Sequence, residues 1–81
     1  MNESIPDTKE LLDAPGQSCA NLTPLIREHI VGLASGEVLE VLSDDPAARE
    51  GVPAWSRLTG HSLIHVIEVD REQTRFFLRR K

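Results

Sequence analysis

The apolar residues between positions 22 and 33 recur every three or four residues, and this spacing limits the fold more than any other feature. They are Leu22, Leu25, Ile26, Ile30 and Leu33. Such a period over three turns predicts an amphipathic helix, which Ser35-Gly36 would end. A helix with one apolar face must bury that face against another element. The rest of the chain therefore has to supply a sheet or further helices.

Strand-like segments lie on both sides of this helix. Residues 8–13 form a first predicted strand, which the turn signal Ala14-Pro15-Gly16 ends. Residues 37–43 carry β-favouring valines and form a second predicted strand. Residues 62–69 and 74–79 form two more, joined by a polar turn at Asp70-Arg71-Glu72. These segments predict the four strands of one sheet.

A second helix is predicted between residues 45 and 60. Asp45 is suited to the N-cap, and Pro46 to the first helical position, where its missing amide hydrogen costs no bond. We expect this helix to be interrupted at Gly51-Val52-Pro53 and to end at Gly60. The order of elements is then β-α-β-α-β-β.

A chain of 81 residues is one small domain with a thin core. The order of elements predicts an α/β (α+β) two-layer sandwich, in which both helices cover one face of a four-stranded mixed sheet. Residues 1–7 are predicted to be a flexible N-terminal lead, and residues 8–81 the single domain.

Charge and composition argue against several function classes. The net charge of −4 disfavours non-specific binding to nucleic acid or to an anionic membrane, and we expect neither as a partner. No apolar run approaches the ~20 residues of a membrane span, and the N-terminus lacks the features of a secretory signal. One cysteine cannot form an internal disulfide, so we expect a cytoplasmic protein. A basic cluster near the end, Arg75, Arg79, Arg80 and Lys81, is interpreted as a solvated strand face, with nucleic-acid binding as the alternative.

The three histidines do not predict a metal site. His61 and His65 lie in or beside a predicted strand, where a separation of four residues is about 13 Å, too far to share one ion. His29 lies in another element. We therefore expect no metal, and because no cofactor motif is present we expect no bound cofactor.

Cys19 is the only cysteine and lies in a polar segment, GQSCANLTP, next to the first predicted helix. At a helix start, free backbone amides and the positive end of the dipole favour a thiolate over a thiol. A surface thiolate can attack a sulfur atom on another protein without a pocket. The alternative is that Cys19 is an inert core residue.

The landmarks of the chain, in order, resemble those of the TusA/SirA-like sulfur-carrier proteins from about residue 10 to 80. They are Leu12-Asp13-Ala14-x-Gly16-x-x-Cys19, Gly36-Glu37-Val38-Leu39-Glu40-Val41, Asp45-Pro46, Pro53-x-Trp55 and Thr59-Gly60-His61-x-Leu63. The resemblance implies that Cys19 accepts sulfur as a persulfide from a cysteine desulfurase. It also implies that the sulfur passes to an acceptor protein in tRNA thiolation, molybdenum-cofactor maturation or sulfur metabolism.

The chain departs from the family pattern at the cysteine itself. The family motif is Cys-Pro-x-Pro, and the matching residues here are Cys19-Ala20-Asn21-Leu22. Two helix starts are therefore possible: at Cys19, with a missing hydrogen bond at Pro24, or later, with Thr23 as N-cap and Pro24 first in the helix. Thr-Pro is a strong start signal, so the later start is favoured.

Four polar neighbours of Cys19 are candidates for orienting the thiol or contacting a partner. Ser18, Asn21 and Thr23 surround the predicted helix start, and Arg27 lies one to two turns along it, where it could meet an acidic partner. The altered motif also motivates a second hypothesis, in which the domain is an interaction or regulatory module that has lost sulfur transfer.

Overall fold

The computed structural model describes residues 6–70 and 72–81, and at Cys19 the backbone only. It contains six elements: β1 (Glu10–Asp13), α1 (Cys19–Ile30), β2 (Val38–Ser43), α2 (Ala48–Thr59), β3 (Ser62–Glu68) and β4 (Thr74–Arg79). The predicted order β-α-β-α-β-β is confirmed. The predicted flexible lead, residues 1–7, lies mostly outside the described residues, and the division at residue 8 stays a prediction.

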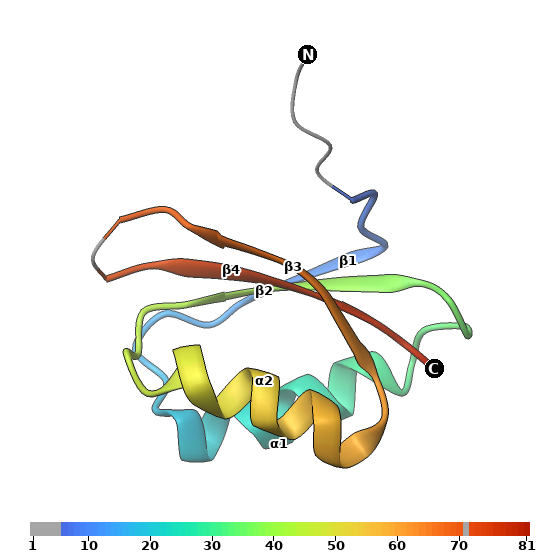
Figure 1. Cartoon of the computed structure of the whole chain (residues 1–81), viewed down its shortest axis with the longest axis horizontal. Helices are drawn as coiled ribbons and strands as arrows, with labels where there is room; N and C mark the ends of the chain where they lie inside the picture. Colours follow the sequence, from blue (N-terminus) through green and yellow to red (C-terminus); the bar gives the residue numbers. More distant parts are fainter. Residues whose placement is uncertain (1–5, 71) are drawn as a thin grey trace.

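The four strands form one open, mixed sheet in the order β1-β2-β4-β3. β1 is parallel to β2, whereas β4 lies between β2 and β3 and is antiparallel to both. α1 and α2 lie side by side beneath one face of this sheet (Figure 1). The predicted two-layer sandwich is therefore confirmed. Because β1 and β2 are parallel, the loops that lead into the two helices leave the same end of the sheet.

The helix-facing side of the sheet contains the main core. Alternate residues of each strand point to this side, so it receives Leu39 and Val41 of β2 and Phe76 and Leu78 of β4. The helices and loops supply the rest of the cluster: Ala14, Leu22, Ile26, Ile30, Leu33, Ala48 and Val52, with Leu12 from β1. The predicted apolar stripe of the first helix thus packs against the sheet.

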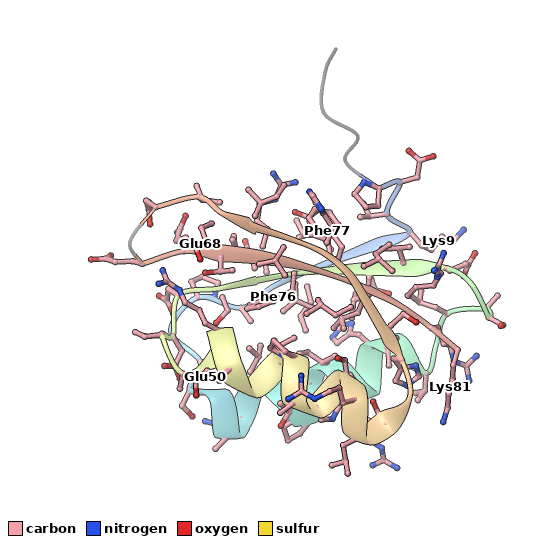
Figure 2. All side chains as sticks on the ribbon, viewed as in Figure 1. Lys9, Glu50, Glu68, Phe76, Phe77 and Lys81 are labelled. Carbon is pink, nitrogen blue, oxygen red and sulfur yellow. The ribbon has the colours of Figure 1, made fainter. Side chains whose placement is uncertain are left out.

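Phe76 and Phe77 are neighbours in β4 but point to opposite faces. Figure 2 shows Phe76 on the helix side of the strand and Phe77 on the other side. Both are fully buried. Phe77 is covered by side chains of the sheet itself, because the His65 ring lies 5.6 Å from it and the Arg75 guanidinium lies 5.4 Å above it. The face without helices therefore has a small aromatic cluster of its own.

The favoured late start of the first helix is wrong. α1 begins at Cys19 with Ser18 as its N-cap residue, and Pro24 lies inside the helix. The Leu22 amide donates to the Ser18 carbonyl at 2.8 Å, and Leu22 is fully buried against the sheet. Burying a leucine side chain contributes about 1.5–3 kcal/mol, which offsets the ~1 kcal/mol of a threonine N-cap and part of the cost of a proline inside the helix. Core packing thus favours the earlier start.

The second helix differs from its prediction in two ways. It is continuous through Pro53, because fully buried Val52 ties this turn to the core. Its N-cap residue is Ala47, whereas Asp45 caps the turn before it by accepting the Ala47 amide at 3.0 Å. The predicted end at Gly60 is confirmed, since Gly60 adopts the left-handed conformation with φ 86°.

His61, directly after this glycine, couples the end of α2 to the end of the chain. Its ring stacks on Trp55 with centroids 5.5 Å apart, and its Nδ1 accepts the Lys81 amide at 3.2 Å. Burial lowers the pKa of His61 below the ordinary 6.5, and the positive charges of Lys81 and Arg80 lower it further. The folded state thus favours neutral His61.

We expect the domain to lose stability on acidification through His61. Below pH 6.5 the unfolded chain protonates this histidine before the folded protein does, so the free energy of unfolding falls as the pH falls. Urea denaturation between about pH 7 and pH 5 should show a steeper loss for the wild type than for His61→Gln. Equal pH dependence of the two proteins would contradict this coupling.

Candidate functional site

The loop before Cys19 is anchored to the end of β2. The Ala14 amide donates to the Leu42 carbonyl at 3.0 Å and extends the pairing of β1 with β2. The Gly16 amide donates to the Asp44 carboxylate at 2.8 Å. Gly16 has φ 83°, a conformation that disfavours side chains, so a glycine is needed at this turn. The role of Asp44 was not predicted from the sequence, because its partner Gly16 lies 28 residues away along the chain.

Cys19 is the first helical residue of α1. The first hydrogen bonds of the helix run from the Asn21 and Leu22 amides to the Ser18 carbonyl. The amides that come before them at such a helix start have no partner within the helix itself. The Ser18 hydroxyl makes no capping hydrogen bond to the described part of this turn, and the turn has no acidic residue. The positive end of the helix dipole is therefore not neutralised by α1 itself.

The four polar candidates do not form one cluster. Asn21 and Arg27 line a shallow groove of about 760 Å³ on the outer side of α1, together with Gln17, Pro24, Leu25, Glu28 and Val31. Ser18, although exposed, and Thr23, which is half-buried, are not among its lining residues. The first residue that lines the groove, Gln17, lies two positions before Cys19 in the sequence, and the other lining residues follow along α1.

This groove was not predicted from the sequence, because the helix was expected to start at Thr23. Positions 21, 24, 28 and 31 recur at intervals of three and four residues, so they follow one face of a helix that begins at Cys19, and Gln17 lies just before its start. With a start at Thr23, Asn21 would lie in a loop instead. The spacing of these residues indicates a shared helix face, but only if the helix begins before Asn21.

Several charged residues considered in the sequence analysis are engaged in contacts within the fold. His29 pairs with Glu10 of β1, and Arg75 pairs with Glu40 at 2.6 Å. Arg80 donates to the Leu33 carbonyl at 2.6 Å. Two of the four residues of the C-terminal basic cluster, Arg75 and Arg80, therefore make contacts within the domain. Neither α1 nor α2, the helices of the described residues, is long and apolar enough to cross a membrane.

Pro24→Ala is expected to stabilise the domain. Pro24 lies in the interior of α1 and has no amide hydrogen to donate to the Ala20 carbonyl, a loss that alanine would repair. We expect a gain of about 1–3 kcal/mol in the free energy of unfolding, measured by urea denaturation. Pro15→Ala, in the exposed loop outside the helix, is the matched control and should bring no gain. No gain from Pro24→Ala would instead favour a helix that starts at Pro24.

Comparisons with known proteins assign the chain to a family. The family model described as sulfurtransferase TusA matches residues 10–80. Two sulfur carrier proteins TusA from strains of Pseudomonas putida are each 31% identical over 81 residues, which cover 100% of this chain and 98% of theirs. The TusA protein of another strain is 33% identical over 64 residues, 79% of this chain and 78% of its own.

A solved structure supports the same fold. The SirA-like protein of Desulfitobacterium hafniense superimposes with a TM-score of 0.75 over 86% of this chain and 95% of its own, at 21% sequence identity. That likeness shows the fold alone, whereas the family model and the relatives from Pseudomonas putida also match this chain in sequence. The chain belongs to the TusA family of sulfur carriers.

Proposed function

We propose that the protein carries sulfur as a persulfide on Cys19, accepting it from a cysteine desulfurase and passing it to an acceptor protein. The observation that carries this proposal is the position of the only cysteine as the first residue of α1, in a chain of the TusA family. Ser18, Asn21 and Thr23 are proposed to orient the sulfur. Arg27 is proposed to contact a partner.

The chemistry needs a nucleophilic sulfur and little else from this chain. The Cys19 thiolate attacks the terminal sulfur of a persulfide on the donor, and a new S–S bond forms as the donor's S–S bond breaks. The donor cysteine leaves as a thiolate, so there is no net oxidation or reduction. The amides of the first helical turn and the helix dipole, at whose positive end Cys19 lies, are proposed to support the thiolate by about 0.3–1 kcal/mol.

Both partners are other proteins in this proposal. The acceptor belongs to tRNA thiolation, molybdenum-cofactor maturation or another route of sulfur metabolism. Because the single thiol must stay reduced before loading, a reducing compartment suits it, and we propose the cytoplasm.

Mass spectrometry of the intact protein tests the loading step. The protein is incubated with a cysteine desulfurase, cysteine and pyridoxal phosphate, and its mass is then measured without reductant. We expect one or more added sulfur atoms, which a reductant removes and which Cys19→Ala does not acquire. An unmodified mass beside a demonstrably active desulfurase would favour the interaction-module hypothesis that the altered Cys-Pro-x-Pro motif motivates.

A further inference from the structure

A second candidate site lies at the other end of the helix layer from Cys19. A pocket of about 440 Å³ opens between the last turns of α2 and the start of β3. Its walls include Arg57, His61 and Ser62 on the polar side and Pro53 and Leu63 on the apolar side. Figure 1 shows the end of α2 and the start of α1 at opposite ends of the layer. This pocket is therefore separate from the sulfur-carrying residue.

Positive charge lies in this pocket at Arg57 and beside it at Lys81. Among residues 6–70 and 72–81, neither Arg57 nor Lys81 forms an ion pair with a carboxylate. The Lys81 side chain lies against Gly60, with its Nζ 3.3 Å from the point where a Cβ of that glycine would be. The chain as a whole carries −4, so this corner opposes the overall charge.

The end of α2 does not neutralise this charge. A helix C-terminus carries a partial charge of about −0.5, whereas Arg57, which lines the pocket, contributes a full positive charge. Burial is the main cause of the lowered pKa of His61, and the positive charges of Lys81 and Arg80 lower it further, so these charges act at the ring that lines the pocket.

The neutral ring of His61 has one hydrogen-bond donor, and its position on the ring is fixed by the Lys81 amide. Its Nδ1 accepts the Lys81 amide, so the neutral imidazole carries its proton on Nε2. The stack on Trp55 fixes the plane of the ring. A neutral histidine, a guanidinium and a serine hydroxyl are donors that suit an oxyanion.

We propose that this pocket binds a small organic anion, with one phosphate or carboxylate group held by Arg57 and His61 and an apolar body against Pro53 and Leu63. The volume of the pocket lies within the ~300–1,000 Å³ of small-molecule sites. This site is independent of the persulfide chemistry.

Fluorescence of Trp55 tests the proposal, because it is the only tryptophan of the chain and stacks on His61. We expect titration with phenyl phosphate to change its emission saturably. Inorganic phosphate, which lacks the ring, should bind about tenfold more weakly or worse, and phenol, which lacks the charge, likewise. Equal affinity for phenyl phosphate and inorganic phosphate would overturn the apolar part of the site, and a response that does not saturate would overturn the site itself.

Two variants separate a site from general attraction to positive charge. Arg57→Gln should weaken phenyl phosphate binding by about tenfold or more, because Arg57 is the exposed guanidinium of the pocket. Lys9→Gln removes the same charge beside β1, at the opposite edge of the sheet from β3, and should leave the affinity unchanged. Equal weakening by both variants, or none by Arg57→Gln, would contradict the proposal.

Discussion

Replacing Cys19 with serine will reduce sulfur transfer, from a persulfide donor through this protein to an acceptor thiol, to the level seen without the protein. A serine hydroxyl does not ionise at neutral pH and cannot form an S–S bond, so the attack and the release are both lost. The two side chains have similar size, and we expect the circular dichroism spectrum to stay that of the wild type. The measurement follows radiolabelled sulfur from cysteine to the acceptor. Transfer by Cys19→Ser at the wild-type rate would exclude Cys19 as the carrier.

Variants of the polar candidates should give graded rather than complete losses. Arg27→Gln should slow loading by up to about tenfold at low salt and less at high salt, if Arg27 meets an acidic partner. Ser18→Ala should leave the free energy of unfolding nearly unchanged, because the Ser18 hydroxyl makes no capping bond within the described turn. A slower transfer by this variant would then report on orientation of the sulfur and not on helix stability. Sulfur transfer at the wild-type rate by both variants would show that neither Arg27 nor Ser18 contributes to the site.

The largest loss of stability is expected from Phe76→Ala. Phe76 is fully buried between the sheet and the helices, and its removal leaves a cavity that well-packed neighbours cannot fill. The expected cost is about 3–5 kcal/mol, comparable with the whole stability of a domain of this size. The variant should therefore be largely unfolded at 25 °C. Far-ultraviolet circular dichroism and urea denaturation provide the measurement.

Phe77→Ala is the matched control, since it removes an equally buried ring from the next residue. The groups over Phe77 are side chains at the surface, His65 and Arg75, which can collapse into the space that the ring leaves. We expect this variant to stay folded and to lose about 1–3 kcal/mol, less than Phe76→Ala. An equal loss for both variants would show that the helix-free face is packed as rigidly as the core.

The order of elements was available from the sequence because its signals are local. Apolar residues at helical spacing, strand segments rich in β-favouring residues and turn-forming glycines each act over a few residues. The left-handed conformation of Gly60 and the amphipathic face of α1 follow from such signals. The candidate cysteine could also be identified, because no other residue of the chain offers a thiol.

The start of α1 and the continuity of α2 were decided by tertiary structure. Locally, Thr23-Pro24 and Gly51-Val52-Pro53 are stronger as boundaries than as helix interiors. In the fold, Leu22 and Val52 are fully buried, and keeping their turns helical places both side chains in the core. The burial of each contributes about 1.5–3 kcal/mol, which offsets much of the roughly 3 kcal/mol that a proline costs inside a helix. A helix boundary is therefore a balance between local preference and packing, and only packing brings the groove residues onto one face of α1.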